Sequence, residues 1–396
     1  MKKRLSMMAA GAFCFCLMPG LARGGEVFDS SSIGQHIIGV LVYNNTDDEV
    51  IAFRNYLENY VEEVFPDVEF LYSDSISSLD QELDFIQNVS DAGAEGILSF
   101  LDYDLESEVA LCEQNEVYYM MASSTVSEAS FEAVKTNPWF LGVVGPGAQT
   151  EYQAGYDMGL YLAGSGSEYF VLTGGAGMGN EMHRQRALGI LQALSDANGV
   201  SFEEDGEDLV RTAEIRHLQA GGIQVCLCPG YMSGDSLEQA RAEYEKDSWP
   251  VVISVMALYE LRDSLKNAVV GMVDCYSENN LQAFTRGGLS YLTGKYASMI
   301  GPSFAAMYNA VTGFAQDFRE DGNAFMVQQG FWTSSDADDY VEKYTLSSSI
   351  ELNAYNYEDL TQMCKRYHPE ADLALLEDYA GKSSFEDVKA RRNLEG

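Results

Sequence analysis

Short apolar runs rich in β-branched and aromatic residues alternate with amphipathic helical patterns between His36 and Ala305. This alternation constrains the fold more than any other feature, because strand, helix and strand in succession favour a parallel sheet covered by helices. Four of the runs are typical of strands buried on both faces: HIIGVLVY, VEFLY, EGILSF and VYYMMA. The sequence therefore predicts an α/β fold, in which binding residues lie at the carboxyl ends of strands.

The segments between these runs have helical periodicity. Apolar residues recur at helical spacing over residues 48–64, and either Asp47 or Asp48 stands where an N-cap would accept free backbone N–H groups. The next segment repeats the pattern from Leu79 and is ended by Gly93. Both segments are therefore predicted to be the crossover helices that join parallel strands.

The first residues have the pattern of an export signal. Lys2, Lys3 and Arg4 form a positive start, an apolar stretch follows at 5–18, and small residues precede a cleavage point near Ala22. The apolar stretch is shorter than the ~20 residues that a membrane-spanning helix needs. We predict a signal peptide at 1–22 and an extracytoplasmic location, in the periplasm or at the cell surface.

The charge of the chain excludes several partners. The chain has 61 acidic and 24 basic residues, and loss of the three basic residues at 2–4 would leave 21, a net charge of about −40. Such a field repels phosphate backbones and anionic headgroups, so we expect neither nucleic-acid nor membrane-surface binding. The acids themselves are typical of solvated surface.

Cysteines and histidines show no arrangement that indicates redox or metal chemistry. Five cysteines follow the signal segment, an odd number without the spacing of a disulfide framework. Cys226 and Cys228 are two apart in a predicted strand, so they share a face and are expected to pack in the core. The four histidines are dispersed and no zinc motif occurs, so we predict no metal and no cofactor.

The chain divides into two similar series of strands and helices. The first ends at FLGVVGPG, where Gly145, Pro146 and Gly147 could carry the chain from one lobe into another. The second starts with the helix TEYQAGYDMGLYLAG and runs through SENNLQAFTRG, with 201–220 expected to be an irregular surface excursion. The predicted limits are 35–144 plus 296–325 for the N-terminal lobe, 145–295 plus 326–345 for the C-terminal lobe, and 346–396 for a C-terminal extension with helical stretches near Tyr355 and Leu373.

Four segments carry a resemblance to a known family: IIGVLVYNN, LTGGAGMGNEMHRQRALGILQAL, VVGMVDCYSENNLQAF and YASMIGPSFAAMYNAVTG. In this order and spacing the chain resembles the type 1 periplasmic binding proteins, the ribose- and galactose-binding group related to the sensor domains of lactose-repressor-like regulators. The resemblance covers most of residues 37–313. It implies two doubly wound parallel-sheet lobes joined by a hinge, with ligand held between them.

The resemblance also implies ligand-binding positions in the first half of the chain. Tyr43, Asn44 and Asn45 follow the first strand, where relatives have an Asn and a pair of aromatics, but here Thr46 and two acids replace that pair. Asn45 fits a turn and helix cap equally well. Asp102 stands where relatives bind ligand hydroxyls, with Asp104 as a rival.

Further positions come from the second half. Arg184 follows the Gly-rich turn where relatives place a ligand-binding Arg, whereas Arg186 is expected to be structural. Asp274 ends the strand VVGMVD, where the family carries an Asp that accepts ring hydroxyls. Tyr231 would supply a second aromatic wall, and either Tyr296 or Lys295 falls where relatives have a hinge Gln.

The sequence contains no complete catalytic or nucleotide-binding motif. GGAGMGNE follows a strand but has Asn180 in place of the third Gly of a dinucleotide fingerprint, so a tight turn is expected. SSDADDYVEKY lacks the Gly of a calcium loop, and no nucleophile elbow occurs. We therefore expect that the protein is not an enzyme. A hydrolase is a weaker third hypothesis, because the sequence shows no assembled catalytic set.

Two functional hypotheses remain. The first is an exported solute-binding protein, expected to be monomeric, that captures a small polar ligand such as a sugar for the permease of an ABC importer. The alternative is an exported sensing module that presents its ligand state to a membrane receptor.

Overall fold

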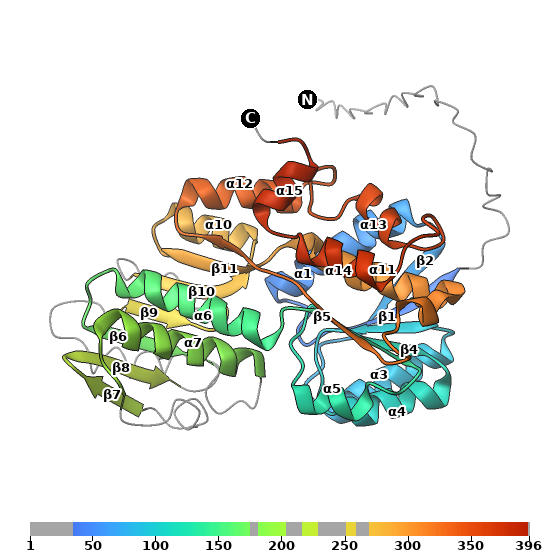
Figure 1. Ribbon diagram of the computed structural model, residues 1–396, viewed down its shortest axis with the longest axis horizontal. Coiled ribbons are helices and arrows are strands. Elements are labelled where there is room, and N and C mark those ends of the chain that lie inside the picture. Colours follow the sequence, from blue (N-terminus) through green and yellow to red (C-terminus); the bar gives the residue numbers. More distant parts are fainter. Residues whose placement is uncertain (1–34, 175–180, 203–215, 229–250, 259–268, 395–396) are drawn as a thin grey trace, which may run out of the picture. The chain divides into compact units, whose positions relative to one another are not determined.

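The fold contains two sheets, each built from strands that alternate with helices (Figure 1). The structure is a computed structural model that describes residues 35–174, 181–202, 216–228, 251–258 and 269–394. The predicted signal peptide at 1–22 and two helices predicted at 236–246 and 258–268 lie outside these residues, apart from Leu258. No helix in the described ranges is long and apolar enough to cross a bilayer.

The first sheet has six strands, all parallel, in the order β12-β5-β4-β3-β1-β2. Four of them match the four apolar runs that the sequence analysis singled out. The sixth strand, β12, comes much later in the sequence and pairs with β5 at the edge of the sheet. The strands are β1 (His36–Leu41), β2 (Val68–Tyr72), β3 (Gly96–Ser99), β4 (Tyr118–Ala122), β5 (Phe140–Gly145) and β12 (Phe325–Gln328).

The second sheet has seven strands in the order β13-β11-β10-β9-β6-β8-β7. Its inner strands are parallel, and the two edge strands β13 and β7 are antiparallel to their neighbours. The strands are β6 (Tyr169–Thr173), β7 (Arg216–Ala220), β8 (Ile223–Cys228), β9 (Val251–Ser254), β10 (Val270–Cys275), β11 (Tyr291–Lys295) and β13 (Trp332–Ser334). The two-sheet α/β fold predicted from the sequence is confirmed.

One expectation about this sheet was wrong. Residues 216–220 form β7, which pairs antiparallel with β8, instead of the irregular excursion expected up to residue 220. Leu218 is buried while His217 and Gln219 are exposed, so the strand is polar on one face and lies at a sheet edge. The polar composition of an edge strand removed the apolar signal used to predict strands.

The two sheets repeat one local design. Strand β3 lies between β1 and β4, and β9 lies between β6 and β10, so the two strands occupy matching places. Each ends in a serine whose Oγ donates to a carbonyl two residues later, Ser99 to Leu101 O at 2.5 Å and Ser254 to Met256 O at 2.6 Å. The first residues after these two strands therefore share one hydrogen-bonded turn.

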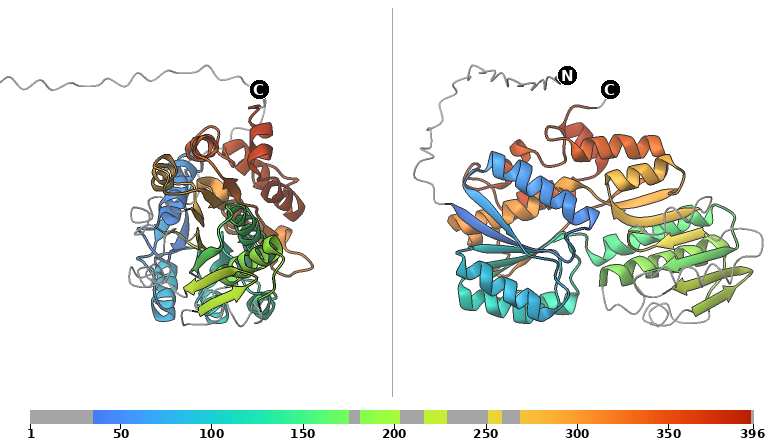
Figure 2. Two further views of the ribbon diagram at one scale, coloured as in Figure 1. Left: turned by 90° about the vertical axis from the view of Figure 1, so that its left-hand side faces the viewer. Right: turned by 180° about the vertical axis from the view of Figure 1, so that it is seen from behind.

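Helices begin at side-chain caps that the sequence provides. Asp47 accepts from Glu49 N at the start of α1 (Asp48–Tyr56), and Ser277 accepts from Asn280 N at the start of α10 (Glu278–Thr285). The remaining helices around the two sheets are η2 (Leu57–Val61), α2 (Glu62–Val64), α3 (Leu79–Asp91), α4 (Leu105–Asn115), α5 (Glu128–Val134), α6 (Ala148–Ala163), α7 (Glu181–Asn198) and α12 (Ala337–Ser348). Helices α6 and α7 lie side by side, as Figure 1 and Figure 2 show.

The C-terminal segment is part of the main core. Helix α11 (Gly301–Asn309) packs on β3, β4 and β5, and the later helices pack on α11 and β12. One buried cluster contains Ile38 of β1 together with Leu376 and Val388 near the end of the chain. The other elements of this segment are η3 (Ala297–Ile300), η4 (Ala310–Phe314), η5 (Ala315–Phe318), α13 (Tyr357–Met363), α14 (Leu373–Gly381) and α15 (Phe385–Arg391).

Candidate functional site

A buried lysine joins the carboxyl ends of strands from both sheets. Lys295, the last residue of β11, donates through Nζ to Glu49 Oε1 at 2.8 Å and to the carbonyl of Ser123 at 2.7 Å. Glu49 is in the first turn of α1, and Ser123 follows β4 in a left-handed conformation with φ 54°. Lys295 is 5 % exposed, so the pair lies away from bulk water. Residues 246 apart in sequence thus meet where strands of the two sheets end.

Three further side chains, Tyr43, Asp47 and Asp274, accompany this ion pair. We call the five residues together the strand-end cluster: Tyr43, Asp47, Glu49, Asp274 and Lys295. The Tyr43 hydroxyl donates to Asp47 Oδ1 at 3.1 Å, and Asp47 also caps α1. Asp274 lies on β10, paired with Gly294 of β11, and its Oδ2 accepts from Asn280 Nδ2 at 2.7 Å. The negative charges of Asp47 and Glu49 act on the Asp274 carboxyl.

Two carboxyl groups of the cluster, those of Asp274 and Asp47, have raised pKa values. The pKa of Asp274 is raised to about 7, chiefly by burial; the Asn280 hydrogen bond lowers it, and the charges of the acids at 47–49 contribute to the rise. Burial and the charge of Glu49 raise the pKa of Asp47 to about 6. Near neutral pH, Asp274 therefore exists both as a carboxylate and as an acid, and can either accept or donate a hydrogen bond.

The two predicted asparagines lie beside this cluster in the turn after β1. Asn44 is exposed, and its Oδ1 accepts from the backbone and hydroxyl of Thr46 at 3.0 and 2.9 Å. Asn45 donates to Ser73 O at 3.3 Å, and its buried Oδ1 has no hydrogen-bond partner among the described residues. Asn44 therefore shapes the turn, and Asn45 retains an acceptor for another group.

Asp102 lies on an exposed loop between β3 and α4. Surrounding protein atoms and the charge of Glu108 raise its pKa to about 6. Beneath the loop, the buried carboxyls of Glu82 and Glu108 both accept from Tyr103 N, at 3.1 and 3.0 Å. Burial and Glu108 raise the pKa of Glu82 to about 10, so a protonated Glu82 beside Glu108 supports the loop. Among the described residues, no hydrogen bond or ion pair joins the Asp102 side chain to the strand-end cluster.

Arg184 and Arg186 differ in their surroundings although both are on α7. Arg184 binds Glu181 of the same helix and remains partly exposed. Arg186 is buried, forms an ion pair with Glu151 of α6, and donates to the Val255 carbonyl at 2.7 Å. Arg186 thus links α6, α7 and the end of β9, whereas Arg184 is held at the start of α7.

The two remaining predicted aromatic positions give different outcomes. Tyr231 lies outside the described residues. Tyr296 is 1 % exposed and stacks on Trp332, with ring centroids 4.1 Å apart. The stacking places its ring in the packed junction between β11 and η3, and Lys295 beside it reaches the cluster.

Sequence reasoning did not single out Glu49 or Ser123. Glu49 follows Asp47 and Asp48, so it looked like another first-turn acid on a helix. Ser123 contributes only a backbone carbonyl, which no side-chain pattern can mark. Its partner Lys295 ends β11, a strand that the sequence pattern did not mark, so no local signal pointed to Glu49.

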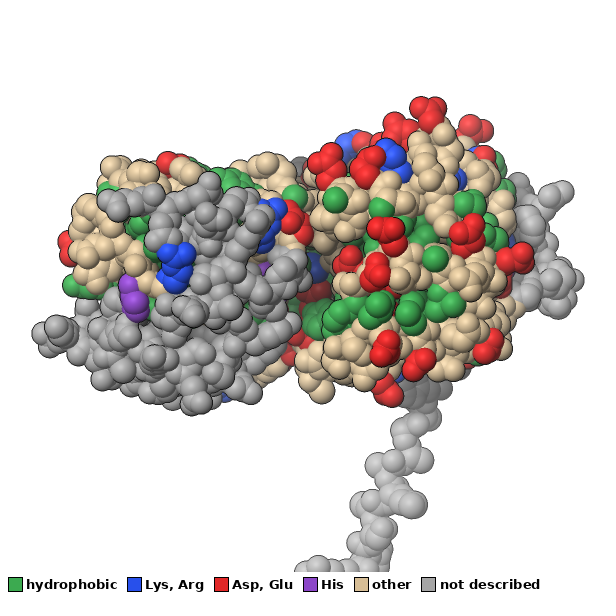
Figure 3. All heavy atoms as spheres, turned by 90° about the horizontal axis from the view of Figure 1, so that it is seen from below, with side chains coloured by type: hydrophobic (Ala, Val, Ile, Leu, Met, Phe, Trp, Pro, Cys, Tyr) green, Lys and Arg blue, Asp and Glu red, His purple; other side chains and the backbone are tan. Residues whose placement is uncertain are grey.

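The strand-end cluster offers several acceptors and one fixed cation. Carboxylates suit paired hydroxyls or ammonium groups, while they repel phosphate. Acidic side chains are also spread over the described surface in Figure 3. No group of three or more His, Cys, Asp or Glu side chains suited to a metal ion occurs within the described ranges.

Comparison with known proteins places this geometry in a wider context. No family model matches the sequence, and no curated protein matches it either. Solved structures do match. An ABC transporter solute-binding protein from Bacillus halodurans C-125 with bound myo-inositol is similar over 80% of this chain and 99% of its own, with TM-score 0.57 and 16% identity. A galactofuranose-binding protein matches over 79% and 98%, with TM-score 0.59 and 11% identity.

A third similar structure is an ABC transporter periplasmic solute-binding protein from Actinobacillus succinogenes 130z with bound D-allose. It matches over 78% of this chain and all of its own (100%), with TM-score 0.57 and 11% identity. The fold of this chain is therefore that of the type 1 periplasmic binding proteins, as the sequence resemblance implied.

Proposed function

We propose that this protein binds a small polyhydroxylated solute, of the sugar or cyclitol class, at the strand-end cluster and presents it to the permease of an ABC importer outside the cytoplasm. The observation that carries the proposal is the convergence of Tyr43, Asp274 and Lys295 from two sheets. Sugar-class ligands in the similar solved structures support the same class here.

The chemistry of the cluster supports binding without catalysis. Asp274 and Asp47 would accept hydroxyl protons, Lys295 would donate, and the Tyr43 ring would pack on the C–H face of the solute. In this proposal Asn44, Asn45, Asp102 and Arg184 line the same ligand, with Tyr231 as its aromatic neighbour. The buried Tyr296, stacked on Trp332, lies behind Lys295 and does not contact the ligand. No residue set for nucleophilic attack accompanies these groups in the described part of the chain.

Several contacts must act together for a two-lobed protein to respond to its ligand. Moving an open-closed equilibrium from 1:99 to 99:1 takes about 5.5 kcal/mol of differential affinity. One charge-assisted hydrogen bond contributes roughly 1.5–3 kcal/mol. A ligand that contacted only one sheet would not supply this differential affinity for the closed state. A ligand that contacted Asp47 after β1 and Asp274 on β10 would gain hydrogen bonds from both sheets.

The test is calorimetric titration of the purified protein with myo-inositol, D-allose and D-galactose. We expect at least one to bind, and Asp274→Asn to weaken that binding roughly 10- to 100-fold through loss of a charge-assisted hydrogen bond. Asp91→Asn, an exposed carboxylate on α3, is the matched control and should bind as the parent does. Absence of binding by all three solutes, or equal binding by Asp274→Asn, would contradict the proposal.

A further inference from the structure

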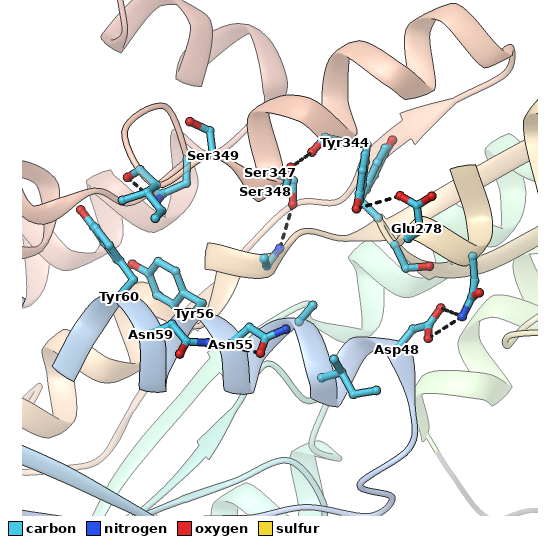
Figure 4. Close-up of a pocket in the computed structure, with 18 residues that line it drawn as sticks. Asp48, Asn55, Tyr56, Asn59, Tyr60, Glu278, Tyr344, Ser347, Ser348 and Ser349 are labelled. Atoms are coloured by element: carbon cyan, nitrogen blue, oxygen red, sulfur yellow. Dashed lines mark hydrogen bonds between the residues drawn. The ribbon is translucent and has the colours of Figure 1, made fainter. Parts of the chain in front are cut away.

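A cavity lies next to the strand-end cluster, and Asp48, between Asp47 and Glu49 of that cluster, is part of its lining. It has a volume of about 410 Å³ and lies between α1, the start of α10, and the end of α12 with the loop that follows. Figure 4 shows Tyr56 of α1 and Tyr60 of η2 on one side and Tyr344 with Glu278 on the other. Pockets of this volume are within the range that holds small organic ligands. We call it the α1–α12 pocket.

The charge of the α1–α12 pocket is negative. Asp48 and Glu278 line it, and its lining contains neither Lys nor Arg. Both carboxylates receive hydrogen bonds from neutral groups, Asp48 from Asn279 Nδ2 at 2.9 and 3.0 Å and Glu278 from the Tyr344 hydroxyl at 3.3 Å. Because these donors carry no charge, both negative charges remain available to a cation.

A buried acceptor on the pocket wall also lacks a donor. Asn353 is 2 % exposed and lines the pocket. Its Nδ2 donates to the Ile350 carbonyl at 3.1 Å, but its Oδ1 has no hydrogen-bond partner among the described residues. A buried acceptor without a donor costs about 1–3 kcal/mol. Rotation of the Asn353 side chain toward a ligand N–H group would recover this cost, because the oxygen itself is covered.

The rest of the wall combines aromatic and aliphatic side chains with neutral Ser and Asn side chains. Tyr56, Tyr60 and Tyr344 contribute rings, and Ile51 and Ile350 contribute large apolar side chains that are 42 % and 62 % exposed. An organic cation can pack its hydrocarbon body on such a wall and place its ammonium group near ring faces and carboxylates. An anion would meet two like charges, and a neutral polyol would leave both carboxylates without a counter-charge.

We propose that the α1–α12 pocket is a second ligand site, which binds a small organic amine with an aromatic or aliphatic body through Asp48, Glu278 and Asn353. The site is separate from the proposed sugar site, because Asp48 bonds to Asn279 whereas Asp47 and Glu49 point into the strand-end cluster. Helix α1 packs in the core of the first sheet, and α10 packs on α12 beside the second. A bound amine therefore joins helices that belong to the two sheets.

The experiment uses phenethylamine and its uncharged counterpart 2-phenylethanol, each titrated into the full chain by calorimetry and by ligand-observed NMR. Phenethylamine should bind and 2-phenylethanol should bind more weakly. Glu278→Gln should weaken phenethylamine about two- to fivefold, the range of a partly exposed ion pair. Ser348→Trp, which adds bulk at an exposed position on the pocket rim, should abolish binding.

The matched control is Asp338→Asn. Asp338 is an exposed first-turn carboxylate of α12, as Glu278 is a first-turn carboxylate of α10, but it does not line the pocket. Its substitution should leave phenethylamine binding unchanged. Equal binding of the two probes, no binding of phenethylamine, or affinity that is indifferent to Glu278→Gln and Ser348→Trp would each overturn the proposal.

Discussion

Asp274 shows how a single buried side chain can make the stability of the whole chain depend on pH. Its pKa in the folded protein is about 7, raised chiefly by burial, against an ordinary value of 3.8. Between about pH 4 and pH 7 the folded state therefore binds a proton that the unfolded state has lost. The free energy of unfolding must fall as the pH rises through this range.

We predict that Asp274→Asn removes much of this pH dependence. The parent should lose stability from pH 5 to pH 8, by at most about 1.4 kcal/mol per pH unit for one proton, and the variant should lose less. Urea unfolding of both proteins at the two pH values measures the difference. Parallel losses in the parent and the variant would show that Asp274 is already ionised at pH 5.

At this scale, sequence reasoning found some members of the cluster and not others. Asp274 was predicted because the family resemblance implies a ligand-binding Asp at the end of the strand VVGMVD, at the carboxyl edge of the sheet. Lys295 was only an alternative to Tyr296, since the sequence does not show which of two neighbours faces the cluster. Glu49 was missed because its partner is 246 residues away.

Helices α6 and α7 show what glycine does at the scale of an element. A methyl group at Gly155 would overlap the Arg186 carbonyl oxygen, and one at Gly189 would overlap the Tyr152 carbonyl oxygen. Absence of a side chain at these positions lets the two helix backbones approach closely. The buried Arg186–Glu151 pair lies across the same contact.

We predict that Gly155→Ala destabilises the protein by about 1–3 kcal/mol, because the helices would have to separate. The comparison is Gly381→Ala at the end of α14, where an added methyl meets nothing and helix propensity favours alanine. Chemical unfolding of both variants gives the two free energies. A stable Gly155→Ala would mean that α6 and α7 can shift apart without loss.

Elements were predictable where their periodicity was strong. Strand β1 and helix α3 coincide with predicted segments, because alternation and helical spacing directly reflect burial. Strand β7 was hidden by its polar face, and β11 was not singled out because YLTGK ends in a lysine and contains glycine. Whether such segments form strands depends on their pairing with neighbouring strands, and a local sequence pattern does not contain that information.

At the scale of the whole molecule, the last fifty residues are integral to the core. Tyr56 of α1 donates to the Tyr355 carbonyl, and Asp67 beside β2 binds Arg366 at 2.8 Å. The Trp332 indole donates to the Ser383 carbonyl at 2.8 Å. The predicted helical stretches near Tyr355 and Leu373 are confirmed as α13 and α14, but their contacts with the first half of the chain could not be predicted from local patterns.

We predict that Leu376→Ala costs about 2–5 kcal/mol of unfolding free energy, as a deep core truncation does, because the side chain is fully buried. Leu394→Ala removes the same atoms from a side chain that is 39 % exposed and should change stability by less than about 0.5 kcal/mol. Equilibrium denaturation compares them. Equal and small effects would mean that the C-terminal helices are an independent appendage.

The cluster that begins at Ile38 and ends at Val388 also sets an order of events during synthesis. The first strands emerge early, yet α11, which packs on β3, β4 and β5, is translated only after residue 300. The face of the sheet that α11 covers therefore stays open while more than 150 further residues are made after β5. The earliest strands of this half must wait for a partner that is made much later in synthesis.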